Sequence, residues 1–300
     1  MTRDLERYLQ PEEIAKISRL ELRARKVVEG FVSGLHRSPY FGQSIEFVQH
    51  REYAPGDDTR RIDWKVWSRT DRYYLKQFEE DTNVRVVLLV DGSESMQFGS
   101  GPLTKFEYAQ TLAAALAMLI LKQNDSVGVG MFDSTIRSII PSSSRHNHLQ
   151  TILQGLSVET AGGKTDMVAV LRRAAEAMAH RSIVILISDL FCDRETLFRG
   201  LQLLRQRKHE VMILHTMDAQ ELNFDYSGSC RFEGLEDAGK LTCDPAALRT
   251  GYLNALKEFL DTIRRRCAGS LIDYRLTRTD ENMGAVLSDL LNFRMGMKGA

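Results

Sequence analysis

Short, fully apolar segments that alternate with helical ones constrain the fold of this chain more than any other feature of its sequence. Residues 84–91 (VRVVLLVD) and 181–190 (RSIVILISDL) are two such segments. Strands this apolar are expected where helices cover both faces of a parallel sheet. Residues 103–122 and 194–208 have helical spacing and follow these strands. The alternation predicts an α/β protein with a doubly wound, mostly parallel sheet.

Charge and apolar content narrow the classes of protein to consider. Hydrophobic residues make up 43% of the 300, and 40 basic residues balance 40 acidic ones. This balance gives no argument for binding to nucleic acid or to an anionic membrane surface, and we expect no nucleic-acid partner. The longest apolar run, residues 112–121, is shorter than the ~20 residues of a membrane span, and residues 1–16 contain no apolar signal core. Because the four cysteines are also far apart, we expect a cytoplasmic protein with reduced thiols and no transmembrane segment, which leaves a membrane-associated partner possible.

The chain is expected to have three parts. Residues 1–34 form an N-terminal helical segment, residues 35–83 a β-rich extension, and residues 84–294 the α/β domain. Residues 226–243 form a hairpin inserted in that domain. Lone hairpins are marginally stable in water. We therefore expect the strands of the extension and of the hairpin to pair with one another in one small β-rich subdomain.

Oxygen-bearing side chains gather where the predicted strands end. Asp91, Ser93 and Ser95 follow the first apolar strand, Asp189 follows a later one, and Thr165 lies in a glycine-rich loop. Ligands of open α/β sheets bind at the carboxyl ends of the strands. Two carboxylates and three hydroxyls are hard ligands that suit Mg²⁺, with Mn²⁺ or Ca²⁺ as alternatives. Two carboxylates roughly neutralise a divalent ion, so an Asp or Glu of a partner can complete its shell.

A local structural role is the alternative for these residues. Ser93 and Ser95 then cap the turn that follows them, and Asp189 caps the helix after it. Capping alone leaves the coincidence of three loops unexplained. His146 and His148 form the only close histidine pair, and their distance in sequence from these loops argues against a zinc site.

At this point the sequence resembles a von Willebrand factor A domain with a metal-ion-dependent adhesion site. The family pattern is DxSxS, then a threonine in a glycine-rich loop, then an aspartate after a later strand, and the order matches from about residue 84 to 291. The resemblance implies that the five residues above bind the metal ion. Lys164 is a departure, because the family often has glycine directly before Thr165.

A second motif lies in the charged stretch before the α/β domain, RxYxxGDDxRxIDW. The first hypothesis is a network of exposed ion pairs that orients the extension, since each such pair contributes only ~0–1 kcal/mol. The second is a partner-binding surface, because tryptophan and arginine are enriched at interface hot spots. The residues concerned are Arg51, Asp57, Asp58, Arg60, Asp63 and Trp64.

The two motifs together resemble a bacterial family catalogued as domain of unknown function fifty-eight, over about residues 34–294. Its members carry a von Willebrand A-like domain and are typically encoded beside MoxR-type AAA+ ATPases. The resemblance implies that the chain is an adaptor or co-chaperone of such an ATPase, with contacts to client proteins.

Enzymatic alternatives are less well supported by the residues. A haloacid-dehalogenase-like phosphatase needs a second aspartate where this chain has Ser93, and no GxxxxGK[ST] phosphate-binding loop occurs. We therefore expect a non-enzymatic, Mg²⁺-dependent protein-interaction module. A metal-dependent hydrolase that uses the same oxygen ligands is the alternative.

Overall fold

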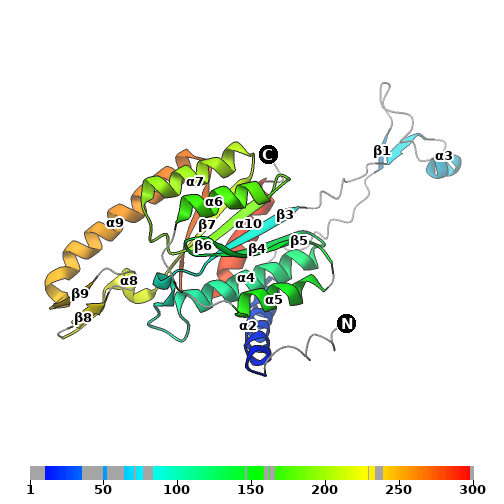
Figure 1. Ribbon diagram of the computed structural model, residues 1–300. Coiled ribbons are helices and arrows are strands. Elements are labelled where there is room, and N and C mark those ends of the chain that lie inside the picture. Colours follow the sequence, from blue (N-terminus) through cyan, green and yellow to red (C-terminus); the bar gives the residue numbers. More distant parts are fainter. Residues whose placement is uncertain are drawn as a thin grey trace. The chain divides into compact units, whose positions relative to one another are not determined.

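The computed structural model in Figure 1 has two compact units, Ser33–Asn83 and the remainder, Met1–Val32 with Val84–Ala300. The structure describes residues 11–35, 50–52, 64–70, 72–76, 84–145, 147–158, 162, 166–228, 230–233 and 239–297.

A six-stranded sheet forms the centre of the larger unit. The order of its strands is β10-β7-β6-β3-β4-β5, and only the pair of β4 and β5 is antiparallel. This confirms the predicted doubly wound, mostly parallel α/β fold. The strands are β3 (Arg85–Asp91), β4 (Ser126–Phe132), β5 (Ile136–Ser143), β6 (Ile183–Ser188), β7 (Glu210–Met217) and β10 (Asp273–Arg278).

Helices cover both faces of this sheet. Figure 1 shows α6 and α7 on one side and α4 on the other. On the first side, buried residues of β3, β6 and β7 pack against residues of α6, α7 and α9. The helices of the larger unit are α2 (Pro11–Leu35), α4 (Lys105–Lys122), α5 (His148–Val158), α6 (Met167–Ala177), α7 (Arg194–Gln206), α8 (Ala219–Asn223), α9 (Pro245–Gly269) and α10 (Met283–Met297), with a 3-10 turn η2 (Glu94–Gln97).

Helix α4 shows how local sequence sets an element that positions the site. The Thr104 side chain accepts a hydrogen bond from the Glu107 backbone N–H, and the Glu107 carboxylate accepts one from the Thr104 N–H. This capping box fixes the start of the helix. The apolar run that follows is buried from Leu112 to Ile120, which anchors α4 in the core.

Helix α2 belongs to the same compact unit as the sheet. Leu20, Ala24, Val28 and Phe31 are each at most 4% exposed and recur every three or four residues, so they lie on one buried face of the helix.

Among the described strands, the extension and the inserted hairpin do not pair with one another as expected. In the smaller unit, β1 (His50–Glu52) pairs with β2 (Tyr74–Lys76), and in the larger unit β8 (Cys230–Glu233) pairs with β9 (Lys240–Cys243). Each is a separate antiparallel hairpin. The Phe232 ring of β8 stacks on the Phe224 ring, with 5.8 Å between the ring centroids, so β8 packs against residues that follow α8.

Candidate functional site

The predicted oxygen ligands gather where two neighbouring strands end. Strands β3 and β6 are parallel neighbours, so Asp91 at the end of β3 lies beside Ser188 at the end of β6. The Ser188 hydroxyl donates a hydrogen bond of 2.5 Å to Oδ2 of Asp91. The structure brings four of the five predicted ligands to this point and buries them: Asp91, Ser93, Ser95 and Asp189.

The loop after β3 directs its hydroxyls toward each other. The Ser93 N–H donates to Oδ1 of Asp91 at 2.9 Å, and the hydroxyls of Ser93 and Ser95 lie 3.1 Å apart. The Ser93 side chain makes no capping bond to the turn η2 that follows it. Helix α7 is capped by Asp193 and not by Asp189. The capping alternative is therefore wrong for Ser93 and Asp189.

The glycine-rich loop is described in part. Thr165 and the neighbouring Lys164 lie outside the described residues. Gly162 of the same loop donates its N–H to the carbonyl of Gly92 at 2.8 Å, and the Arg137 side chain donates to the Gly162 carbonyl. This segment of the loop thus lies against the loop of Asp91, and the role of Thr165 stays a prediction.

The two carboxylates of the cluster have different electrostatic environments. Burial, together with the charge of Asp189, raises the pKa of Asp91 to about 7. Burial also raises the pKa of Asp189, but the Lys105 ammonium and several hydrogen bonds outweigh it and hold that pKa below its usual range. Among the described residues, no lysine or arginine forms an ion pair with Asp91.

Sequence reasoning missed the ammonium group at this site. Lys105 is 2% exposed, and its Nζ lies 2.8 Å from Oδ2 of Asp189 and 2.7 Å from Oε1 of Glu221. Burial lowers the pKa of Lys105, but the two carboxylates more than offset this and keep the group charged. The signal in the sequence is a lysine at the first position of a helix, where the helix dipole favours an acidic residue.

Further polar groups hold the strand ends in place. The buried His215 ring contacts the Asp189 carbonyl through Nε2 at 2.9 Å and the Tyr274 hydroxyl through Nδ1 at 2.7 Å. Burial lowers the pKa of His215 to about 4, so the ring is neutral. Asp218 accepts hydrogen bonds from Ser100 and Thr279, which tie the loop after η2 to the ends of β7 and β10.

The donor set fits a small divalent cation. All the gathered side chains offer hard oxygen atoms, which Mg²⁺ and Ca²⁺ prefer. Asp91 is a buried carboxylate whose donors among the described residues are hydroxyl and amide groups, so a nearby cation would relieve its repulsion with Asp189. Within the described part of the chain, no group of three or more His, Cys, Asp and Glu side chains is placed to hold a metal, and a site made from two aspartates and hydroxyls does not need one.

Other predicted or possible sites contribute less. His148 uses Nε2 to contact the Val127 carbonyl at 2.8 Å, and His146 lies outside the described residues. Of the charged motif, Arg51 lies in β1 and Trp64 begins α3 (Trp64–Thr70). Its other members, Asp57, Asp58, Arg60 and Asp63, lie outside the described residues, so their role stays a prediction.

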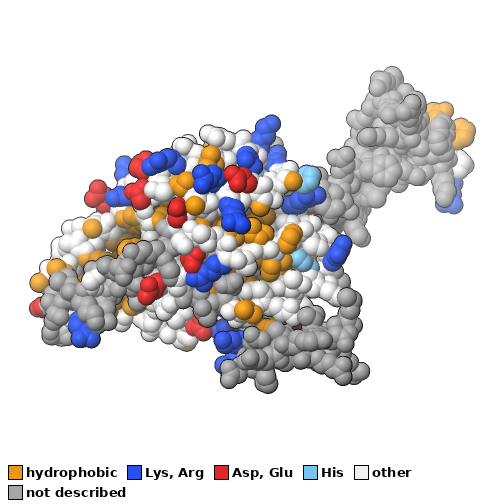
Figure 2. Space-filling model, viewed as in Figure 1, with side chains coloured by type: hydrophobic (Ala, Val, Ile, Leu, Met, Phe, Trp, Pro, Cys, Tyr) orange, Lys and Arg blue, Asp and Glu red, His pale blue; other side chains and the backbone are white. Residues whose placement is uncertain are grey.

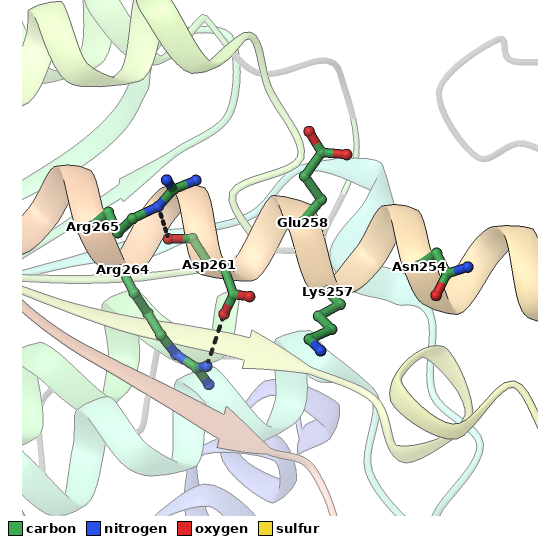
Figure 3. Close-up of a pocket in the computed structure, with 6 residues that line it drawn as sticks. All are labelled: Asn254, Lys257, Glu258, Asp261, Arg264 and Arg265. Atoms are coloured by element: carbon green, nitrogen blue, oxygen red, sulfur yellow. Dashed lines mark hydrogen bonds and ion pairs between the residues drawn. The ribbon is translucent and has the colours of Figure 1, made fainter.

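The described part of the outer surface includes a polar pocket on α9. Figure 3 shows a polar pocket along α9, where the Asp261 carboxylate pairs with Arg264 at 3.5 Å and the Asp261 backbone carbonyl accepts a hydrogen bond from the Arg265 side chain. On the face seen in Figure 2, acidic and basic side chains are interspersed over the larger unit. No helix among the described residues is long and apolar enough to cross a membrane.

Comparison of the sequence with known proteins finds a matching family and several relatives. The family model described as "Protein of unknown function DUF58" matches residues 49–259. Uncharacterized proteins from Mycobacterium bovis and two strains of Mycobacterium tuberculosis are 26% identical over 288 residues, covering 94% of this chain and 89% of each relative.

Solved structures show a partial likeness at low identity. The conserved hypothetical protein BatB from Bacteroides thetaiotaomicron is 16% identical, with a TM-score of 0.47 over 70% of this chain and 97% of that chain. An aerotolerance-related membrane protein from Bacteroides fragilis is also 16% identical, with a TM-score of 0.45 over 70% and 99% of the two chains. These descriptions name no substrate or reaction.

Proposed function

We propose a function on the premise that this chain belongs to the DUF58 family. The chain is a non-enzymatic interaction module of von Willebrand factor A type, in which a bound Mg²⁺ ion joins the protein to a carboxylate of its partner. The observation that carries the proposal is the cluster of four buried oxygen side chains at the ends of β3 and β6, in which Asp91 has no basic partner among the described residues.

The chain's own residues divide the work of binding the ion. Asp91 and Asp189 supply negative charge, and the Ser93 and Ser95 hydroxyls supply neutral oxygen ligands, with Thr165 as the fifth predicted ligand. When bound, Mg²⁺ supplies an electrophilic centre for an oxygen of an outside carboxylate. Mn²⁺ and Ca²⁺ are alternative ions with the same preference for oxygen.

A binding role is favoured over hydrolysis because the described carboxylates of the cluster, Asp91 and Asp189, are assigned to the metal as ligands, and the neighbouring His215 offers no free ring nitrogen as a base. His215 is buried and neutral, and it uses both ring nitrogens in contacts to the Asp189 carbonyl and to Tyr274. A hydrolase would need a base within hydrogen-bond reach of an attacking water. A metal-dependent hydrolase that uses the same ligands remains the second candidate.

The partner we propose is a MoxR-type AAA+ ATPase, with the chain as its adaptor or co-chaperone toward client proteins in the cytoplasm. This identity comes from the family resemblance. A second contact surface is proposed at Arg51, Asp57, Asp58, Arg60, Asp63 and Trp64, where charged and aromatic residues suit recognition of a protein.

The test is calorimetric titration of the cognate ATPase with this protein, first in Mg²⁺ and then in excess chelator. We expect binding in Mg²⁺ only, and none for Asp91→Asn. The matched control is Asp125→Asn, because the Asp125 carboxylate accepts the Val84 N–H at the opposite end of the sheet. Equal affinity with and without Mg²⁺ would remove the metal from the mechanism. Mg²⁺-dependent cleavage of generic phosphoesters or peptides, abolished by Asp91→Asn, would favour the hydrolase.

A further inference from the structure

The Lys105 ammonium lies beside the proposed metal site, because it contacts the predicted ligand Asp189. We propose that Lys105 is a built-in counter-cation that sets the affinity of the site: its ammonium competes with a divalent ion for Asp189 and moves onto Glu221 when the ion binds. This inference rests on the proposed metal site and adds a residue, and a link to α8, that the ligand set alone does not contain.

The position of Lys105 is costly for the fold, which argues for a role at the site. The residue is the first of α4, where the positive end of the helix dipole repels an ammonium group. It is also 2% exposed, and a buried charge is tolerated only with close partners. Residues that conflict in this way with their local structure are found mainly at functional sites.

Glu221 is a fixed second acceptor for the ammonium. Its Oε2 atom accepts the Asp218 N–H at 2.9 Å in the capping box of α8, and its carbonyl accepts the Tyr252 hydroxyl at 2.9 Å. Neither contact involves Lys105. The ammonium can therefore leave Asp189 and keep its 2.7 Å contact with Glu221, so that releasing Asp189 does not leave a buried charge without a partner.

The charges around the cluster still match a divalent ion when Lys105 and Glu221 are counted together with the two aspartates. Asp91, Asp189 and Glu221 carry three negative charges when ionised, and the Lys105 ammonium cancels one of them. The remaining two are balanced by one divalent cation. Without the ammonium the site is more negative, and the Oδ2 atom of Asp189 loses its ion pair while Oδ1 still accepts the Phe191 N–H. The site therefore attracts a divalent ion more strongly.

The test measures Mn²⁺ and Mg²⁺ affinity of the full chain by isothermal titration at fixed ionic strength. Lys105→Met keeps the length of the side chain and removes its charge, and we expect binding to be at least about tenfold tighter, equivalent to about 1.4 kcal/mol. Glu221→Gln removes the second acceptor, and we expect binding about fivefold weaker because the ammonium is held at Asp189. The control is Lys122→Met at the exposed other end of α4, which leaves the affinity unchanged.

The metal affinity is expected to rise in Lys105→Met and to fall in Glu221→Gln. A merely structural role of Lys105 would instead lower the affinity in both variants. In the double variant, the weakening by Glu221→Gln should disappear because no ammonium is left to redirect. Equal or weaker binding in Lys105→Met than in a wild type that binds metal would overturn the inference and leave the metal site standing. If neither protein binds a divalent ion, the metal site and the inference both fail. If Lys105→Met does not fold, the test rests on Glu221→Gln. Unchanged or tighter binding of the divalent ion by Glu221→Gln would then overturn the inference about Lys105.

Discussion

Buried polar groups occur at both ends of the six-stranded sheet, but they differ in charge. At the amino ends of the strands, His209 and Ser182 are neutral, and the Ser182 N–H donates to the His209 ring at 3.2 Å. At the carboxyl ends, the buried groups include Asp91, Asp189 and Lys105, which carry charge. Neutral pairs stabilise the fold at modest cost, whereas buried charges need partners or a ligand. The difference is the reason why we propose the binding site at the carboxyl end of the sheet.

The largest effect is expected from removing the buried Lys105 ammonium at the carboxyl end. Lys105→Met leaves Asp189 buried without its 2.8 Å partner, and breaking a buried ion pair from one side costs about 3–5 kcal/mol. We expect the free energy of unfolding, measured by urea denaturation in chelator, to fall by that amount, and Mg²⁺ to restore part of it by replacing the lost charge. A loss below about 1 kcal/mol in chelator would show that the two ends do not differ as described.

Most of the fold was predictable because its strands and helices have strong local patterns. The apolar strand at residues 84–91 appears as Arg85–Asp91, and the N-terminal helical segment expected within residues 1–34 contains the helix Pro11–Leu35. The short helices α3 and α8 were missed, since five to seven residues carry little periodicity. The pairing of the hairpins was also wrong, because strand partners depend on contacts between segments distant in sequence.

The site was predictable where strand ends fix the geometry. Asp91 and Asp189 meet because β3 and β6 are neighbours, and the sequence placed both residues at strand ends. Lys105 and Glu221 were missed, since their meeting depends on how α4 and α8 pack. The local sequence signal for Lys105 was its place as the first residue of a helix. Sequence spacing thus indicates ligands that come from strand ends better than partners that come from helices.

A glycine at the carboxyl end tests whether the loop there is sterically tight. A Cβ at Gly99 would lie 2.6 Å from the Thr104 Cα and 2.8 Å from the Leu103 carbonyl oxygen. Gly99→Ala should therefore displace the start of α4 and lower the free energy of unfolding by about 1–3 kcal/mol. Gly101→Ala is the matched control, since its Cβ meets no atom within 4 Å. Equal thermal midpoints for the two variants would contradict the expected clash.

The amino end is expected to respond to pH. Burial, with the nearby Arg207 charge second, lowers the pKa of His209 from the ordinary 6.5. The unfolded chain therefore binds the proton more readily, so the contribution of His209 to stability is full above pH 6.5 and is lost as the pH falls below it. The loss approaches about 1.4 kcal/mol per pH unit at most.

His209→Gln should reduce this pH dependence, measured by urea denaturation between about pH 8 and pH 5.5. Metal affinity should stay unchanged, because His209 lies at the end of β7 opposite to the site. A change in metal affinity without a change in the pH dependence would reverse the roles of the two ends.

The smallest effect is expected for an exposed ion pair at the amino end. The Arg181 guanidinium lies 2.6 Å from the Glu210 carboxylate, closer than Lys105 lies to Asp189, but the Arg181 side chain is 71% exposed. Water and salt screen such a pair, so Arg181→Gln should change the free energy of unfolding by only ~0–1 kcal/mol, and less at high salt. Urea denaturation at low and high ionic strength measures both. If Arg181→Gln cost as much as Lys105→Met, contact distance rather than burial would determine the strength of these pairs, and the buried ammonium would lose its special standing at the carboxyl end.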